Sequence, residues 1–535
     1  MEQLSCDVLV VGSGGAGLRA AIAAREKGGE VLVISKASPG KATSTTISAG
    51  VFAGTPQGVS PDNHMARTLQ AGRGLNQSEL VRILVDEAPQ RLQELMQWGI
   101  KAVFRNGYLY SLGAAPMWGR EITKCLVAKC KALGVRFFGD MIVAALNMEM
   151  GTAGVLVYRV ESDQWVTINA KALVLGTGGA GALFQRHDNP RRMLGDGYIL
   201  AFNAGALLQH IEFVQFYPFG VAEPGFPSFL IPPRLADLGK LFNGKGEEIY
   251  EKYGITERPA GERARDRLSQ ALFIEIHRVG EEIWLDLTGV SEDDWQKDPF
   301  SGSTRKILGD RYGAVARPLR IAPMAHHVMG GIRIEPRGFT SVPGLFAAGE
   351  VTGGVHGANR MGGNALTETL VFGKRAGDAA AEWALNMNQS NEKYTADALQ
   401  AFFQNSSKSK KNIDPERLTG QLQRIMWSEG GILRNQKGLI KTLESVKNIQ
   451  QQAAEASLEC HPDEVQRLLE LRFAAATAAL ILEAALKREE SRGAHYREDF
   501  PDQNDENWRG HLQVYLDAEG KKIWKFKPIP ITNNQ

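Results

Sequence analysis

The chain has few cysteines, no prevailing charge of one sign and no long hydrophobic run. Its 4 cysteines among 535 residues are too few and too scattered for a disulfide framework, which fits a reducing compartment. With a formal charge of +2, the composition does not favour binding to nucleic acid or to a membrane surface. No apolar segment reaches the length of a membrane-spanning helix. These absences leave an ordinary globular protein of about two to four domains.

The sequence also lacks the features of a secretory leader. The N-terminus runs directly into a predicted strand, with no basic leader segment and no cleavage site. We therefore expect a cytoplasmic protein that would reach a membrane only through partner subunits.

A dinucleotide-binding pattern opens the chain. The stretch CDVLVVGSGGAGLRAAIAAREKGGEVLVISK reads as a strand, a glycine-rich turn, an Ala-rich helix and a second strand. In this context Gly12 permits a tight turn, Gly14 lets the backbone approach a pyrophosphate, and Gly17 lets the helix lie close to the strand. The pyrophosphate would sit at the helix N-terminus, beside Gly15 and Ala16, where N–H groups and the helix dipole favour an anion. A glycine turn without a ligand is the alternative.

The acidic residue that ends the second strand in plain NAD sites is absent. Ser35 and Lys36 stand there instead. A serine hydroxyl can still bond a ribose, and strand-to-glycine transitions recur at 171–181 and 344–354. These additional glycine-bearing strands indicate a larger and more deeply bound cofactor, so we predict FAD rather than NAD.

The recurring transitions predict one nucleotide-binding domain that is interrupted by an insert. We place the FAD-binding domain at 1–220 and 321–385, and an inserted capping domain, rich in proline and charged residues, at 221–320. Polar amphipathic helices predict a C-terminal helical domain over 395–500, followed by a tail over 501–535. The predicted fold class is α/β.

Two histidines stand side by side in APMAHHVMGG. Neighbouring residues of an extended segment point to opposite faces, so His326 and His327 can hardly reach one small ligand together. No cysteine or acidic cluster stands beside them at metal-ligand spacing, and we predict no metal site. Taken alone, the pair favours one packed and one solvent-facing histidine.

Many motifs of the chain resemble those of the flavoprotein subunit family of succinate dehydrogenase and fumarate reductase, whose relatives include L-aspartate oxidase. The resemblance covers nearly the whole chain. It implies a Rossmann-like FAD-binding domain split by an α+β capping domain, followed by a C-terminal helical domain. The motifs are GSGGAGLRAA, ISKASPGKATSTTISAG, GTGGAGALF, GDGYILAFNAGA, EFVQFYPFG, RDRLSQALF, APMAHHVMGGI, LFAAGEV, HGANRMGGNALTETLVFG and REESRGAHYREDFPDQNDENWRGH.

The resemblance implies a role for each matching residue. Arg265 falls on the catalytic acid of the family. His326 and Arg360 fall on the residues that bind a substrate carboxylate, which a guanidinium matches with two hydrogen bonds. His326 would then face the substrate and His327 would face away. The implied FAD contacts are Gly12, Gly14, Gly15, Ala16, Gly17, Ser35, Lys36, Thr43, Gly178, Asp196, Glu350, Asn364, Ala365 and Leu366.

Several positions depart from the family pattern. Thr43 stands where respiratory members carry the histidine that attaches FAD, so we expect FAD to be non-covalent. The family binds the second carboxylate of its substrate through a histidine and a Thr-Glu pair. Tyr217 replaces that histidine, Phe219 replaces a threonine beside it, and Ile231 and Pro232 fall on the pair.

The proton relay of the family is also changed. The glutamate of that pair and a nearby arginine normally supply protons to the catalytic arginine, but Pro232 and Leu235 stand at these positions. Arg234 and Asp237 are near enough in sequence to substitute if the loop shifts. Tyr217, Phe219 and Arg234 are therefore the predicted contacts at an end of the substrate site that has become apolar and aromatic. Burying an unpartnered carboxylate there would be costly, so a symmetric dicarboxylate fits poorly.

These features predict an enzyme that passes hydride between FAD N5 and a carbon next to a carboxylate or acyl group. It would reduce C=C or oxidise CH–CH bonds, with Arg265 handling the proton. The alternatives are a true fumarate reductase or succinate dehydrogenase flavoprotein subunit, a non-catalytic electron-relay subunit of a larger redox complex, and an oxidase that reduces O₂. We expect a small carboxylate or acyl substrate and an iron–sulfur or other electron-transfer subunit as partners. We expect neither nucleic acid nor direct membrane insertion.

Overall fold

The computed structural model describes residues 2–54, 60–113, 119–226, 229–312, 315–387, 412–458 and 460–530. Its central sheet has six strands in the order β6 (Arg136–Phe138), β2 (Val31–Ile34), β1 (Glu2–Val11), β9 (Gln164–Leu175), β8 (Thr152–Arg159) and β7 (Met141–Glu149). A seventh strand, β16 (Leu345–Ala347), also pairs with β9. The pairs of β1 with β2 and with β9 are parallel, while β8 and β7 join antiparallel. Val8 to Val11 are buried, as an apolar run in a sheet covered on both faces requires.

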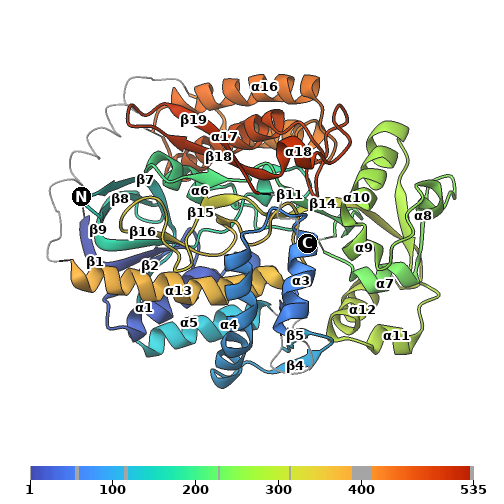
Figure 1. Ribbon diagram of the computed structural model, residues 1–535, viewed down its shortest axis with the longest axis horizontal. Coiled ribbons are helices and arrows are strands. Elements are labelled where there is room, and N and C mark those ends of the chain that lie inside the picture. Colours follow the sequence, from blue (N-terminus) through green and yellow to red (C-terminus); the bar gives the residue numbers. More distant parts are fainter. Residues whose placement is uncertain are drawn as a thin grey trace.

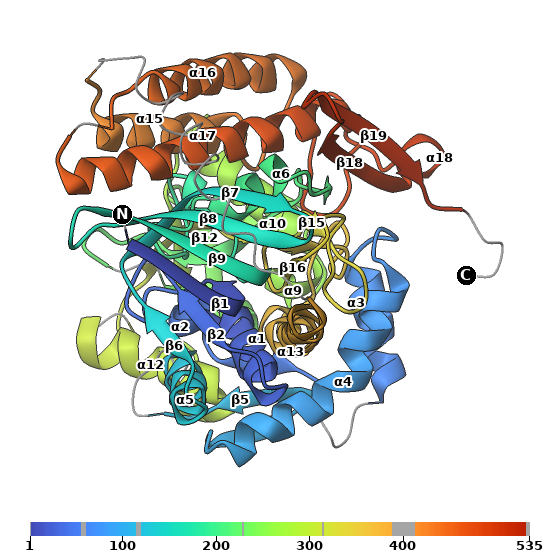
Figure 2. The same ribbon diagram turned by 90° about the vertical axis from the view of Figure 1, so that its left-hand side faces the viewer.

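Two helices pack against each other beside this sheet, as Figures 1 and 2 show: α1 (Gly15–Glu26) and α13 (Asn364–Asn386). Their backbones approach closely because α13 presents glycine to α1, and a Cβ on Gly377 would lie 2.2 Å from the Ala20 carbonyl oxygen. The neighbouring elements are α2 (Ser44–Ile47), α3 (Pro61–Ala71), α4 (Ser78–Gln97), α5 (Gly119–Ala132) and a small sheet of β3 (Val51–Ala53), β5 (Tyr108–Ser111) and β4 (Ala102–Arg105).

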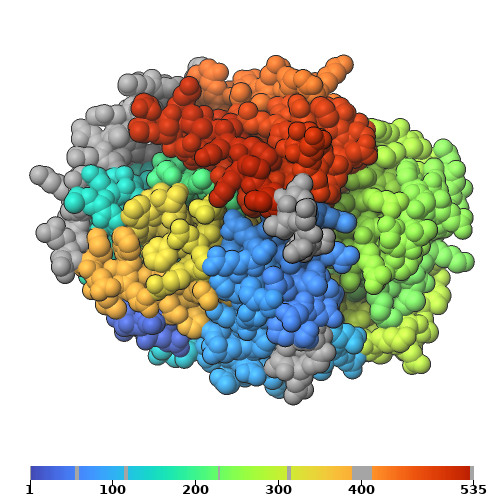
Figure 3. Space-filling model, viewed as in Figure 1, coloured from blue at the N-terminus to red at the C-terminus, as the bar shows by residue number. Residues whose placement is uncertain are grey.

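Residues 214–328 form a second unit, here called the cap, at one end of the molecule (Figure 3). It has its own hydrophobic core. The predicted boundaries after residues 220 and 320 fall within two paired strands, β11 and β14. The strands of the cap, in sheet order, are β11 (Val214–Val221), β14 (Leu319–Val328), β13 (Ile283–Asp286) and β12 (Lys240–Asn243). Its helices are α7 (Pro233–Leu238), α8 (Ile249–Lys252), α9 (Ala260–Arg263), α10 (Arg265–Ile274), α11 (Glu292–Gln296) and α12 (Pro299–Tyr312).

The C-terminal part contains the predicted helices, and Figure 2 shows them stacked on one side of the central sheet. They are α15 (Pro415–Ser428), α16 (Gln436–Ala454) and α17 (Pro462–Lys487). The predicted tail contains α18 (Asp505–Trp508) and a hairpin of β18 (Gly510–Leu516) and β19 (Lys522–Pro528). The hairpin extends a sheet that also contains β10 (Leu208–Gln209), β15 (Gly331–Arg333) and β17 (Thr352–Gly353). Within the described ranges, none of the helices combines the length and the apolarity that crossing a bilayer needs.

Candidate functional site

A large cleft lies between the glycine-rich turn, the segment around α2, strand β14 and the cap. Its volume of about 1380 Å³ exceeds the roughly 1,000 Å³ upper end of ordinary small-molecule sites, so it has room for a dinucleotide and a substrate. The predicted catalytic residues Arg265, His326 and Arg360 all line it. So do most predicted FAD contacts, namely Gly12, Gly14, Gly15, Ala16, Ser35, Lys36, Thr43, Gly178, Asp196, Glu350, Ala365 and Leu366.

The glycine-rich turn fits a pyrophosphate. Gly12 has φ of +110°, and a Cβ there would lie 2.2 Å from the Gly176 carbonyl oxygen. A Cβ on Gly17 would lie 1.9 Å from the Gly12 carbonyl oxygen, so Gly17 serves the contact of α1 with β1 and does not line the cleft. At Gly14 the nearest atoms would be 3.7 Å away, on Thr43. The space beside Gly14 is therefore available to a ligand, at a helix end where the Gly15 amide donates to Thr45 Oγ1 at 3.0 Å.

The end of the cleft that would bind the ribose and adenine carries a lysine and a carboxylate. Lys36 Nζ lies 2.9 Å from the Asp196 carboxylate, at the start of α6 (Asp196–Asn203). Ser35 Oγ donates a hydrogen bond to the Ala37 carbonyl oxygen at 2.7 Å. Towards a ribose hydroxyl, Ser35 can therefore act only as an acceptor.

Asn364 does not line the cleft but supports it from behind. It is fully buried at the start of α13. Its Oδ1 lies 2.7 Å from His64 Nε2, and its Nδ2 donates to Thr68 Oγ1 at 2.9 Å. Asn364 thus ties α13 to α3, and its neighbours Ala365 and Leu366 line the cleft.

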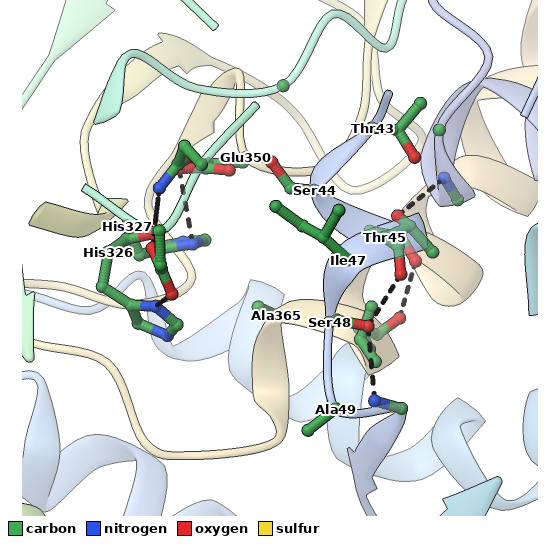
Figure 4. A pocket seen from close by; sticks show the side chains of 18 of the residues that line it. Thr43, Ser44, Thr45, Ile47, Ser48, Ala49, His326, His327, Glu350 and Ala365 are labelled. Atoms are coloured by element: carbon green, nitrogen blue, oxygen red, sulfur yellow. Dashed lines mark hydrogen bonds and ion pairs between the residues drawn. The ribbon is translucent and has the colours of Figure 1, made fainter. Parts of the chain in front are cut away.

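Residues of α2 face Glu350 across the cleft, as Figure 4 shows. Thr43 caps α2 by accepting a hydrogen bond from the Thr46 amide at 3.1 Å. Ser44 Oγ is buried and lacks a hydrogen-bond partner in the described part of the chain, so it is available to a cofactor. Glu350 accepts a hydrogen bond from the Val328 amide at 3.0 Å, and burial raises the pKa of Glu350 to about 7. Sequence reasoning missed Ser44, although it follows Thr43 directly.

Two buried arginines of the cleft lining each have a side-chain N–H group without a partner in the described part of the chain. The side chain of Arg265 donates from Nε to the Gly261 carbonyl at 2.9 Å, and that of Arg360 from Nη2 to Gln215 Oε1 at 2.9 Å. Arg265 Nη1 and Arg360 Nε have no partner among the described residues. Burial, together with the positive charge of Arg265, lowers the pKa of Arg360 to about 10. Two buried cations with free donors favour an anionic ligand such as a carboxylate.

A chain of hydrogen bonds runs from Arg360 to Asp266, the residue that follows Arg265 in the chain. Gln215, which accepts from Arg360, donates to Asn359 Oδ1 at 2.5 Å. Asn359 Nδ2 donates to Asp266 Oδ2 at 2.6 Å, directly beside Arg265. Burial raises the pKa of Asp266 to about 6. This network holds the cap helix α10 in register with the loop of Arg360, and sequence reasoning identified neither Gln215 nor Asp266 as functional.

His326 has a carboxylate partner that sequence reasoning also missed. Its Nδ1 lies 2.6 Å from Asp188 Oδ2. Burial lowers the pKa of His326, and Asp188 opposes that shift. His327, which we expect to face away from the substrate, lies 3.6 Å from Glu350 and packs on His356, and it also lines the cleft.

His327, His356 and Glu368 form a buried cluster whose possible metal-ligand atoms lie within 4.8 Å of one another. Ligand atoms around zinc lie closer together, at about 3.3 Å for metal–nitrogen distances of about 2.0 Å. His356 Nε2 is already 2.8 Å from the Glu368 carboxylate. Within the cluster only His356 and Glu368 share a hydrogen bond, and because the atoms are spaced too widely for zinc we assign no metal to it.

The three predicted contacts on the cap side occupy different environments. The Tyr217 hydroxyl donates to the Ile231 carbonyl at 2.6 Å, and its ring lies 5.8 Å from that of His326. Phe219 is fully buried in the core of the cap and does not reach the cleft. Arg234 lines the cleft but is bound to the Asp294 carbonyl and lies 3.4 Å from the carboxylate of the same residue. The remaining cap-side lining combines the apolar Phe229, Leu230, Pro232, Pro233, Pro259, Phe300 and Ile307 with the charged Glu262, Lys297, Asp298 and Lys306.

Comparisons with known proteins agree with this geometry. Residues 7–366 match the family model described as FAD binding domain, and residues 419–534 match the model described as fumarate reductase flavoprotein C-term. The chain is 32% identical to one subunit of the fumarate reductase (CoM/CoB) of Methanothermobacter marburgensis, over 98% of this chain and 99% of that protein. It is also 32% identical to an L-aspartate oxidase of Synechocystis, over 97% and 98% of the two chains. The FrdA chain in a solved structure of E. coli quinol fumarate reductase is similar with a TM-score of 0.88 and 28% identity, over 100% of this chain and 98% of that one.

Proposed function

We propose that this chain reduces or forms a carbon–carbon double bond next to a carboxylate, in a substrate whose other end is apolar. The chain belongs to the flavoprotein family of succinate dehydrogenase, fumarate reductase and L-aspartate oxidase. It is an FAD-dependent oxidoreductase, as its relatives are. The observation that carries the substrate class is the asymmetry of the cleft. Arg265, Arg360 and His326 supply buried basic groups to the cleft lining, and Tyr217, Phe229, Leu230, Pro232 and Pro233 supply apolar surface to it.

The residues of the chain divide the chemistry between them. Arg360 and His326 bind and orient the carboxylate, and the Asp188 and Gln215 contacts fix both side chains in place. Bound FAD supplies the site that donates or accepts the hydride. Arg265, with its unpartnered Nη1, gives the proton to the other carbon of the double bond or removes it. The apolar wall excludes water from this side.

A true fumarate reductase is the second candidate, because cations do line the cap side of the cleft. Arg234 and Lys297 are both bound to Asp294, at 3.4 and 2.8 Å. Lys306 is solvent-exposed on α12. A second substrate carboxylate would have to displace Asp294 from Arg234, so the geometry favours a monocarboxylate.

Turnover of a monocarboxylic enoate such as 2-butenoate, with reduced viologen as electron donor, tests the proposal. Steady-state turnover would exclude a pure electron-relay role. Failure to reduce every enoate, with intact FAD and normal reduction by the viologen, would favour that relay role. Peroxide release in air would identify the oxidase alternative.

We also propose an electron-transfer partner of the iron–sulfur type. The Methanothermobacter relative is named as one subunit of its enzyme, and the solved E. coli relative is part of a quinol fumarate reductase. A partner of this kind would carry electrons between the flavin and a distant donor or acceptor. Any contact with a membrane would then come through the partner.

FAD is expected to be tightly bound but not covalent. Thr43 lines the cleft at the attachment position and has no side-chain atom that can form the family's histidyl link. After acid precipitation, the yellow colour should stay in the supernatant. Flavin fluorescence in the protein band of a denaturing gel would contradict this expectation.

Carboxylate binding is expected to weaken as the pH rises. In the free protein, burial keeps the pKa of His326 below its usual value of 6.5, and its Nδ1–H points at Asp188. A neutral imidazole that donates from Nδ1 cannot also donate from Nε2, so binding a carboxylate requires proton uptake. The dissociation constant of butyrate should therefore rise by up to about tenfold per pH unit above that pKa.

Asp188→Asn tests the same linkage. Loss of the carboxylate removes the interaction that raises the pKa of His326, so butyrate should bind more weakly at every pH above 6.5. FAD content should not change, because Asp188 contacts His326 rather than the glycine-rich turn. Butyrate affinity that is independent of pH in the wild type would show that His326 does not bind the carboxylate as a cation.

A further inference from the structure

The two positions that relay protons in the family cannot do so in this chain. Pro232 lines the cleft, and Leu235 is fully buried. Neither side chain can carry a proton. Arg265 itself is only 7% exposed, so the proton that it transfers in each turnover must pass through another group.

The acidic residues that line the described cleft are the candidates for the group that exchanges protons with Arg265. Four of them are already engaged: Asp188 by His326, Asp196 by Lys36, Asp298 by Ser301, and Glu350 by the Val328 amide. The fifth is Glu262. Its carboxylate forms no hydrogen bond or ion pair with any residue that the structure describes. Asp237, the other acidic residue near the relay positions, binds the Ala260 amide at 3.0 Å and lies outside the cleft lining.

Glu262 is solvent-exposed and lines the same cleft as Arg265. It belongs to α9, three residues before Arg265 opens α10, and both side chains line the cleft. The Arg265 guanidinium carbon lies 5.4 Å from the centre of the Tyr217 ring. Burial raises the pKa of Tyr217, while the charge of Arg265 opposes this rise and that of Glu262 adds to it. Both charges act on this ring, and both side chains line the same cleft. Because Glu262 is solvent-exposed, its carboxyl group can exchange protons with bulk water.

We infer that Glu262 relays protons between solvent and Arg265, in place of the glutamate and arginine that the family uses. This inference rests on the proposed function. In the reducing direction, one carbon of the double bond takes a hydride and the other takes a proton from Arg265. The two side chains form no direct hydrogen bond, so the neutral guanidine regains its proton from the Glu262 carboxyl group through water in the cleft, and the resulting carboxylate takes one from bulk water. Oxidation runs the same transfers in reverse.

The test uses the complete FAD-loaded protein with Glu262→Gln, which keeps the shape of the side chain but cannot relay a proton. We expect kcat for 2-butenoate to fall at least about tenfold, with a larger solvent deuterium isotope effect. KM, FAD content and butyrate binding, measured by the flavin absorbance change, should stay within about twofold of the wild type. Glu262→Asp should recover part of the rate, and so should added imidazole as a mobile proton carrier.

Glu257→Gln is the matched control. Glu257 is also a glutamate of the cap, but it is ion-paired with Arg267 at 2.8 Å and does not line the cleft. This variant should keep wild-type kcat and isotope effect. Normal kcat and isotope effect in Glu262→Gln would overturn the relay while the proposed function stood, and so would an equal loss of butyrate binding and kcat. A wild-type protein that turns over no enoate would overturn both.

Discussion

Arg265→Lys is expected to remove most of the turnover and to leave the FAD content unchanged. Lysine keeps the positive charge but loses the planar fork of donors, of which Nε binds the Gly261 carbonyl and Nη1 is buried without a partner among the described residues. Loss of a general acid typically lowers the rate by roughly 10²- to 10⁴-fold. The measurement is kcat for 2-butenoate, together with the ratio of flavin to protein absorbance.

Arg267→Lys is the control for this experiment. Arg267 is two residues away on the same helix, but it is paired with Glu257 and lies outside the cleft lining. It should behave as the wild type. Near-normal turnover in Arg265→Lys would remove Arg265 from the mechanism, whereas loss of FAD in that variant would make its role structural.

Succinate is expected to bind to the oxidised protein roughly 100-fold more weakly than butyrate. Both ligands place one carboxylate against Arg360 and His326, but the second carboxylate of succinate would face Tyr217 and the apolar wall. Desolvating that charge without a partner costs about 3 kcal/mol, which corresponds to the stated ratio. The dissociation constants can be measured by the change in flavin absorbance.

Tyr217→His should reduce the difference between the two ligands. It restores the residue type that the family uses for the second carboxylate, at a position whose ring lies 5.8 Å from that of His326. Succinate should gain affinity and butyrate should not. If succinate is the tighter ligand in the wild type, Arg234 has left Asp294 to bind the second carboxylate, and Arg234→Gln should then abolish that preference.

The parts of the fold that depend on local sequence could be predicted. The apolar run of β1, the glycine spacing and the Ala-rich helix specify the opening β-α-β unit, and each of its three glycines has the environment that its predicted role requires. The insertion of the cap between two parts of the FAD-binding fold follows from glycine-bearing strands on both sides of a dissimilar segment. The strands β9 and β16, which end in these glycines, do pair with each other.

Long-range contacts could not be predicted from local patterns. Asp188 and His326 are 138 residues apart, and Asn359 and Asp266 are 93 residues apart. Such pairs are brought together by the sheet and the cap rather than by spacing in the sequence. The hairpin near the C-terminus is a similar case, because its polar strands gain their place by pairing with β10, about 300 residues earlier.

Phe219 shows where strand periodicity fails. In a regular strand, Tyr217 and Phe219 would point to the same face. However, the pairing of β11 with β14 shifts register between Tyr217 and Gly220. Both side chains belong to the core of the cap, where their rings lie 6.2 Å apart, but only Tyr217 also lines the cleft.

The reoxidation of reduced flavin tests the central claim most directly. Anaerobic protein with fully reduced FAD would be mixed with fumarate or with 2-butenoate at the same micromolar concentration, and the return of the oxidised flavin absorbance would be followed in time. An asymmetric site predicts that 2-butenoate reoxidises the flavin faster than fumarate. If fumarate is the faster oxidant at micromolar concentration, the site accepts two carboxylates and the proposed substrate class is wrong.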